Sequence, residues 1–429
     1  MRSTIVIKSL LNRRGTVLLT LLSLVISIVL VLGINHVRSE VKKSFQNTLS
    51  GTDLIVGARG GALNLLLYSV FHMGNPTHNI RWNTFEELAK HSQVEWLIPL
   101  AMGDSHKGYR VVATSDVFFK HYAHGNHFSL VFNEGAPFAD STQVVIGAAV
   151  ARELNYKPGD KIILAHGVAE VSLAKHDDSP FVVSGILAPT GTPVDKALYI
   201  SLAGMELIHR DWQSGVHVPK PHSQTQHAAH DEGEEHDHHQ FENGHPQTLS
   251  AILVGLKNRS ATFTVQRQIN QYPAEPLQAI LPGLTLAELW QLLASAETTF
   301  NLIAWLVVIA SLLGMVTCLL TALNERQREF AIIRSLGAGY FYIFYLVMME
   351  ALVLCLFAIA VAVVLLTAMI AALQPWFVSQ WGVHLSLNIL TEPQFKYLVT
   401  VLVIALLMAV IPALIACRRN LSDGLVIRN

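Results

Sequence analysis

A histidine-rich run in the middle of the chain carries the residues best suited to chemistry. It holds eight of the 20 histidines among 429 residues, with Asp and Glu between them: His217, His222, His227, His230, His236, His238, His239 and His245. Neutral imidazole is a good ligand for zinc, copper and nickel, and carboxylates can complete the coordination shell. The run therefore predicts metal binding, with zinc as the candidate metal.

The same segment, residues 213–248, lacks the apolar residues of a core, and we expect it to be a disordered loop. A catalytic metal site needs ligands that are held by supporting hydrogen bonds, which such a loop cannot supply. The loop suits a flexible, weak collector or sensor of metal ions, which gains positive charge as the pH falls toward the histidine pKa of about 6.5. A metalloenzyme is disfavoured because no H-E-x-x-H or similar rigid ligand set occurs.

The composition of the chain indicates a membrane protein. Hydrophobic residues make up 51% of it and charged residues only 14%, against about 25% in an average soluble domain. The net charge of -1 argues against nucleic-acid binding, which requires a basic face. The three cysteines lie in apolar runs, so we expect no disulfide framework in the polar middle of the chain.

Four apolar runs are long enough to span a bilayer as helices, namely residues 16–34, 300–323, 341–373 and 397–417. The first run is too long for the apolar region of a signal peptide and lacks a cleavage site, so we interpret it as a retained anchor. Basic residues gather in 1–15, 324–340 and 418–429. The positive-inside rule therefore predicts that these segments, with both termini, are cytoplasmic. The loop 374–396 and the middle of the chain would then lie in the periplasm of a bacterial inner-membrane protein.

The middle of the chain, residues 51–283, is large enough for a folded domain. Short β-rich runs such as "FVVSGIL" and "AILVGL" alternate with helical segments such as "AAVARELN", which is an α+β pattern. Residues 35–50 and 284–299 predict two helical stalks. The second stalk has Thr285 and Glu288 at capping-box spacing. Two unrelated amphipathic helices packed on the core are the alternative. The predicted fold is four transmembrane helices with a large α+β extracytoplasmic domain between the first and second.

The most specific motif is "NERQREFAIIRSLGAGYFYIF", at 324–344, in which a charged turn leads to a short amphipathic helix and a glycine break. Here the chain resembles the FtsX-like permeases of ABC transporters, which include MacB, LolC and LolE. In that family this segment is the coupling helix that docks on the ATPase subunit. The resemblance implies that the contact is made or shaped by Arg326, Arg328, Glu329, Arg334 and Gly337. An ordinary positive-inside loop is the alternative.

The resemblance covers nearly the whole chain. The segment "VVIGAAVARELNYKPGDKI" is similar to the MacB-like periplasmic core domain, and "TGTPVDKALYIS", "SGTDLIVGARGG" and "PALIACRRNLSDGL" fit a DevC-like branch of these permeases. The histidine-rich run departs from the family and is interpreted as an insertion. Glu350 lies inside the third apolar run, where an ionisable group is costly and usually faces protein or water. We expect it to pair with a polar group of the bundle.

The chain has no G-x-x-x-x-G-K-[ST] phosphate loop, so we expect no ATP hydrolysis and no cofactor on the chain itself. The resemblance implies that a separate cytoplasmic ABC ATPase, in two copies, binds ATP and magnesium. It also implies a second copy of this permease, contact with membrane lipids and an accessory periplasmic protein.

The predicted function is that of a permease subunit. It relays ATPase motion to the periplasmic domain, by mechanotransmission, for export or extraction of a periplasmic or amphiphilic substrate. The alternatives are a zinc-linked ABC transport system that uses the histidine-rich loop, and a non-transporting signal transmitter that regulates a cell-wall enzyme.

Overall fold

A computed structural model describes residues 14–48, 50–125, 127–166, 180–209, 212–213, 216–217, 245–335, 337, 339–381 and 385–418. The contacts within the chain divide it into two compact units. The helical unit comprises Met1–Val41, Leu293–Phe377 and Leu385–Asn429. The sheet unit comprises Lys42–Leu292 and Val378–His384.

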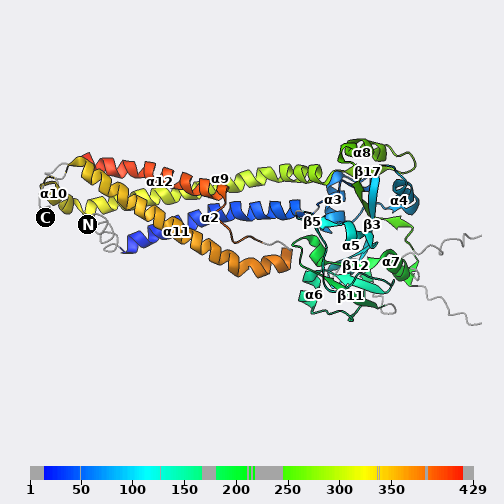
Figure 1. Ribbon diagram of the computed structural model, residues 1–429. Coiled ribbons are helices and arrows are strands. Elements are labelled where there is room, and N and C mark those ends of the chain that lie inside the picture. Colours follow the sequence, from blue (N-terminus) through cyan, green and yellow to red (C-terminus); the bar gives the residue numbers. More distant parts are fainter. Residues whose placement is uncertain are drawn as a thin grey trace, which may run out of the picture. The chain divides into compact units, whose positions relative to one another are not determined.

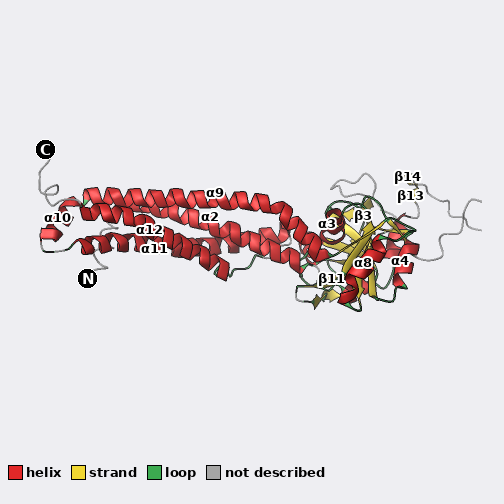
Figure 2. Ribbon diagram, turned by 90° about the horizontal axis from the view of Figure 1, so that it is seen from above, coloured by secondary structure: helices red, strands yellow, loops and turns green. Residues whose placement is uncertain are grey.

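Within the described residues, the helical unit is built from four long helices, α2 (Arg14–Asn47), α9 (Pro282–Glu325), α11 (Tyr340–Trp381) and α12 (Glu392–Arg418). Each is long and apolar enough to cross a membrane, by length and composition. The four lie side by side in Figures 1 and 2. The short helix α10 (Gln327–Ser335) lies at the same end as the first turn of α2 and the last turn of α12.

Small residues make up much of the buried face of α12. In α12 the buried residues recur every fourth position, at Val401, Ala405, Ala409 and Ala413. Large apolar side chains point outward instead, as Leu407 does with 65% of its surface exposed. Small residues let two backbones approach closely, and lipid tails accept exposed leucines without a penalty. Helix α12 therefore has small residues on its buried side and large apolar residues on its outer side, as expected of a helix in a membrane bundle.

The sheet unit is organised around one mixed sheet. Within the described residues, nine of its eleven strands follow the order β17-β1-β16-β3-β4-β12-β8-β11-β7, while β10 pairs with β3 and β9 with β11. The β11–β8 and β12–β4 pairs are parallel, and the other pairs of this sheet are antiparallel. The strands are β1 (Leu54–Ala58), β3 (Val94–His106), β4 (Tyr109–Thr114), β7 (Phe132–Gly135), β8 (Gln143–Ile146), β9 (Lys161–Ile162), β10 (Ala165–His166), β11 (Phe181–Leu187), β12 (Ala197–Ser201), β16 (Ala251–Leu256) and β17 (Leu277–Ile280).

Helices and two-stranded ribbons surround this sheet. The helical elements are α3 (Ala62–Phe71), α4 (Trp82–Ala89), α5 (Val117–His121), α6 (Ala148–Leu154), α7 (Leu202–His209), α8 (Thr262–Asn270) and the 3-10 turns η1 (Pro193–Lys196) and η2 (Arg259–Ala261). The ribbons pair β2 (Ile80–Arg81) with β15 (Thr248–Leu249), β5 (Ala123–His124) with β6 (Phe128–Ser129), and β13 (Trp212–Gln213) with β14 (Val216–His217).

Both faces of the sheet are apolar, which explains why its central strands have no polar alternation. On β12, Leu198 belongs to one buried cluster, together with residues of α6, α7 and α8. Its neighbour Tyr199 belongs to the other cluster, with residues of α3 and α5. The sheet is thus the middle of three layers. The predicted fold class, four membrane helices with an α+β domain between the first two, is confirmed.

The structure differs from the predicted boundaries at several helix ends. The segment predicted as the first stalk, 35–50, is helical as far as Asn47 and continues the first membrane helix, because α2 runs without a break from Arg14 to Asn47. Thr285 is not a helix cap, since α9 begins at Pro282 and the Thr285 N–H already donates to the Leu281 carbonyl at 3.0 Å. Proline is favoured in the first turn, where its missing N–H costs nothing. Helix α11 continues past Pro375 to Trp381, so the predicted loop 374–396 is shorter than expected. Membrane helices tolerate an internal proline of this kind.

Candidate functional site

Helix α10 is a short helix with defined ends. Its first turn contains Glu329 and its last turn Arg334, the charges that oppose the helix dipole at each end. Gly337, with a φ of +96°, turns the chain after the helix, and its N–H donates to the Arg334 carbonyl at 3.0 Å. A left-handed φ of this kind strains any residue with a Cβ. The predicted glycine break is therefore confirmed.

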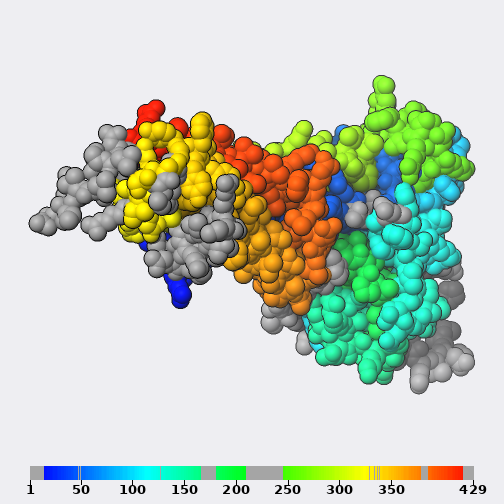
Figure 3. All heavy atoms as spheres, turned by 60° about the vertical axis from the view of Figure 1, so that its left-hand side comes forward, coloured from blue at the N-terminus to red at the C-terminus, as the bar shows by residue number. Residues whose placement is uncertain are grey.

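The two sides of α10 differ in burial. Among its described side chains, Glu329, Ile332 and Ser335 are exposed, and they recur every third residue. Ile332 has 58% of its surface exposed. Ala331 is buried, and Phe330 belongs to a cluster with Leu323 of α9, Val347 of α11 and residues of α12. One side of α10 is thus anchored on the bundle, and the other belongs to the molecular surface (yellow in Figure 3).

Arg326 is the residue between α9 and α10, and its side chain is only 7% exposed. Its Nε lies 2.7 Å from Glu329 Oε2, and its Nη1 lies 3.6 Å from Glu350 Oε2 on α11. The guanidinium carbon lies 5.0 Å from the centre of the Phe330 ring. A buried arginine is normally paired. Arg326 therefore faces carboxylates of its own chain.

The remaining residues predicted for this site have different surroundings. The guanidinium of Arg334, which is half-buried, lies 4.6 Å from the centre of the Tyr340 ring. Arg328 lies on α10, but its side chain is outside the described part of the structure. Their predicted contact with an ATPase stays a prediction.

Most of the predicted metal ligands lie outside the described residues, including His222, His227, His230, His236, His238 and His239. His217 ends β14, and its side chain is not described. His245 stacks on Trp82, with 4.0 Å between the ring centres. Within the described ranges, no group of three or more His, Cys, Asp or Glu side chains is placed to hold a metal ion.

The last turn of α2 contacts the core of the sheet unit. Phe45 stacks on Phe71 of α3 at 4.5 Å between ring centres and meets Trp290 of α9 edge-on at 5.7 Å. The Tyr122 hydroxyl donates to the Thr48 carbonyl at 2.5 Å. We call these contacts the α2 joint. Aromatic pairs of this geometry contribute about 0.5–1.5 kcal/mol each beyond their burial.

A loop beside the α2 joint is ordered by one buried carboxylate. Asp195 accepts hydrogen bonds from the N–H groups of Thr190 and Gly191, at 2.9 and 2.8 Å, and from the Thr190 hydroxyl at 2.8 Å. The Ser44 hydroxyl of α2 donates to the Gly191 carbonyl at 3.3 Å. The segment "TGTPVD" thus forms a fixed turn against α2.

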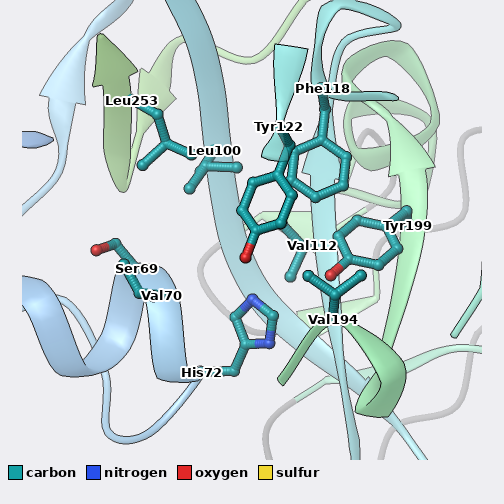
Figure 4. A pocket seen from close by; sticks show the side chains of 10 residues that line it. All are labelled: Ser69, Val70, His72, Leu100, Val112, Phe118, Tyr122, Val194, Tyr199 and Leu253. Carbon is teal, nitrogen blue, oxygen red and sulfur yellow. The ribbon is translucent and has the colours of Figure 1, made fainter. Parts of the chain in front are cut away.

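Tyr122 of the α2 joint also lines a small cavity of about 10 Å³, which is enough space for one water molecule. The side chains of His72, Tyr122 and Tyr199 point toward one another around it (Figure 4). His72 caps α3 in the left-handed conformation, with a φ of 54°. Among the described residues, His72 Nδ1 and the Tyr199 hydroxyl have no hydrogen-bond partner.

The cavity changes the acidity of the groups that line it. The pKa of His72 is lowered to about 4, mainly by burial and also by the positive charge of Arg110, while the contact with the Pro193 carbonyl opposes both effects. Burial also raises the pKa of Tyr199 well above its ordinary value. His72 is therefore neutral near neutral pH, and Tyr199 keeps its proton.

These cavity residues were not found in the sequence, because each lies in a different apolar or aromatic run. The sheet brings them together through contacts between distant segments. The only local signal was the pairing of threonines with an aspartate in "TGTPVD", which is typical of a side-chain-stabilised turn.

A multi-pass membrane protein with an α+β domain inserted after its first helix is the class that these features define. The family model of the MacB-like periplasmic core domain matches residues 17–272, and that of the FtsX-like permease C-terminal region matches residues 301–421. The first match alone covers more than half of the chain. The chain therefore belongs to the FtsX/MacB family of ABC transporter permeases.

Two solved structures have weak similarity to the chain. The periplasmic region of MacB from Actinobacillus actinomycetemcomitans is 9% identical, with a TM-score of 0.33, and the match covers 56% of this chain and 94% of that one. The extracellular domain of YknZ from Gram-positive bacteria is 12% identical, with a TM-score of 0.31 and coverage of 53% and 98%. Both scores are low, so the family assignment rests on the family models. No curated protein matches the chain.

Proposed function

We propose that the chain is the membrane subunit of an ATP-driven transporter and relays the motion of a separate ATPase to its sheet unit. The observation that carries this proposal is α10, which is anchored to the bundle on one side and exposes Glu329, Ile332 and Ser335 on the other. An exposed isoleucine between polar residues suits a docking contact. The proposed partner is a cytoplasmic ABC ATPase in two copies that binds ATP and magnesium, with a second copy of this permease completing the assembly.

Helices α2 and α9 are the proposed path of the motion. They are cross-linked by polar contacts at several levels of the bundle. Ser23 donates to Ser311 at 3.0 Å, Asn35 to Asn301 at 3.4 Å, and Arg38 forms an ion pair with Glu297. Hydrogen bonds between helices in an apolar environment have few competing partners. The pair should therefore move together.

The same helix, α2, also holds the segment that precedes α12. His36 Nε2 donates to the Ser386 carbonyl at 2.8 Å, and the Ser386 N–H donates to the Glu40 carboxylate at 3.3 Å. The backbone N–H and the backbone carbonyl of Ser386 are thus both hydrogen-bonded to side chains of α2. A displacement of α2 should therefore reach α12 as well as the sheet unit.

The proposed orientation places α10 and the nearby helix ends in the cytoplasm of a bacterial cell and the sheet unit in the periplasm. It follows from the basic residues at this end of the bundle, which include Arg14, Arg326, Arg334 and Arg418. The test uses spheroplasts that express a variant in which the natural cysteines are replaced. A membrane-impermeant maleimide should label Phe263→Cys of the sheet unit in this variant, but not Ser335→Cys of α10. The opposite pattern contradicts the orientation.

The proposed substrate is a periplasmic or amphiphilic molecule that the complex exports or extracts. The relay can be tested with Ile332→Asp in the full chain, purified from its natural host in mild detergent. The matched control is Val131→Asp, at an apolar residue of the sheet unit with 61% exposure against 58% for Ile332.

We expect ATP hydrolysis and an ABC ATPase to co-purify with the parent chain and with Val131→Asp. Both should fall about tenfold or more with Ile332→Asp, because a buried charge without a partner costs several kcal/mol. Equal recovery from both variants contradicts docking at α10. Robust hydrolysis by the chain without any companion contradicts the proposal as a whole.

Zinc-linked transport is the second candidate function, and the eight histidines from His217 to His245 favour it. The run would gather zinc or receive it from a partner. Deleting 218–244 should impair growth under zinc limitation while leaving growth in zinc-replete medium unchanged. Growth that is unaffected by the deletion in both media contradicts this function.

A further inference from the structure

Arg326 has a position that the coupling role alone does not explain. It lies at the junction of α9 and α10, where its N–H donates to the Ala322 carbonyl at 3.2 Å and its carbonyl accepts from the Phe330 N–H at 3.0 Å. The helical hydrogen bonds thus continue on both sides of this residue. A residue with such backbone contacts and a buried side chain can fix the angle between two helices.

The two carboxylates that contact Arg326 differ in their exposure to solvent. The side chain of Glu329 is 60% exposed, so water can solvate its charge without help. The side chain of Glu350 is only 8% exposed and belongs to a helix that is apolar enough to cross a membrane. A buried carboxylate requires a partner of opposite charge to stay ionised. Arg326 therefore places a charge of opposite sign 3.6 Å from a buried carboxylate of α11, in addition to its shorter contact with Glu329.

These contacts link three helices through one guanidinium. The arginine belongs to the junction of α9 and α10, Glu329 to the exposed side of α10, and Glu350 to α11. Phe330 covers the guanidinium and packs in the same cluster as Leu323 and Val347. Rotation of α10 about its junction would have to separate Arg326 from Glu350 or pull α11 along with it.

We infer that Arg326 is a positioning residue, which sets the angle of α10 against α11 through its buried contact with Glu350. This inference deepens the proposed function, since it rests on α10 as the docking helix. It assigns the surface contact with a partner to Glu329 and Ile332, and it gives Arg326 an internal role. A displacement of α10 by the partner would then move α11 directly through this ion pair, in addition to moving α9 and α2.

The test compares two carboxylates by the same chemical change. Glu350→Gln removes the buried charge, and Glu329→Gln is the matched control at the exposed carboxylate. The double variant Arg326→Met with Glu350→Met removes both charges while keeping their volume. Buried ion pairs replaced in this way often leave a protein folded. The double variant therefore keeps the test valid if Glu350→Gln alone fails to fold.

The first measurement needs no partner protein. Spin labels at Ser335→Cys on α10 and Leu407→Cys on α12, in the full chain without its natural cysteines, report the position of α10 within the helical unit. We expect Glu350→Gln and the double variant to broaden the distance distribution about twofold, because both lose the ion pair that joins Arg326 to α11. Glu329→Gln should retain the parent distribution. A parent-like distribution in both Glu350 variants, or equal broadening in Glu329→Gln, overturns the inference.

The second measurement separates this inference from the proposed function. In the co-purified complex the label on α10 is moved from Ser335 to Gln327→Cys, which is not among the exposed residues of the helix. Glu350→Gln should then retain the ATPase but lose the response of the spin-label distance to ATP. If no ATPase binds the parent chain while the first measurement succeeds, the proposed function fails and the positioning role of Arg326 stands. If the ATPase binds and Glu350→Gln responds to ATP as the parent does, the positioning role fails alone.

Discussion

Acidification should destabilise the sheet unit through His72. Its imidazole ends α3 beside the cavity, where burial and the charge of Arg110 lower its pKa from 6.5 to about 4. Between these two values the unfolded chain binds a proton that the folded chain rejects. The folded pKa is the lower one, so the stability contributed by neutral His72 is present above 6.5 and is lost as the pH falls through this window.

The size of the effect follows from the two pKa values. A group that shifts from 6.5 to about 4 on folding lowers the free energy of unfolding by about 2 kcal/mol between about pH 7 and about pH 5. This figure is an upper bound, because His72 as a whole is only half-buried. The loss should level off below about pH 4, where the folded protein also binds the proton.

The effect can be isolated with His72→Asn. Asparagine tolerates the left-handed conformation that His72 adopts, with its φ of 54°, and it does not titrate. The full chain in mild detergent would be unfolded in urea at about pH 7 and at about pH 5. Hydrogen exchange of the backbone amides of β4, β8 and β12 would report the opening of the sheet unit. The other histidines affect both proteins alike. An equal loss of stability in the parent and in His72→Asn on acidification would refute the reasoning.

Three further substitutions test the contacts of the sheet unit, each by urea unfolding of the full chain. Phe45→Ala should cost about 2–3 kcal/mol, because it removes the contacts with Phe71 and Trp290; an equal loss in Phe45→Leu would exclude an aromatic contribution. Asp195→Asn should cost about 2–3 kcal/mol by weakening three charge-assisted hydrogen bonds, and a loss within error of zero would contradict this role. Tyr199→Phe should cost about 1 kcal/mol if a water molecule satisfies its hydroxyl, while unchanged or higher stability would show that the cavity is dry.

The sequence predicted the fold class well because apolar runs report burial directly. The predicted strands at Phe181–Leu187 and Ala251–Leu256 coincide with β11 and β16. Each is short, rich in apolar residues and bounded by turn residues, so local chemistry defines its ends. The order of the strands in the sheet could not be predicted in the same way, since it depends on pairing between distant segments.

The candidate site was predictable as a segment but not in its detail. The glycine break at Gly337 was visible because a left-handed turn favours one residue type. The direction in which Arg326 points was not, because Arg326 and Arg334 look alike as charged residues of one loop. Only the packing of α10 against α11 turns the first toward Glu350 and leaves the second half-buried beside Tyr340.

The arrangement of β1 between β16 and β17 places the beginning and the end of the inserted domain on neighbouring strands. Phe45 and Trp290, which flank the domain in the sequence, are also in contact. An inserted domain whose first and last residues lie close together can be enlarged, exchanged or removed without disrupting the helices that flank it in the sequence. The membrane part of such a protein can therefore be retained through evolution while different outer domains are fitted to different tasks.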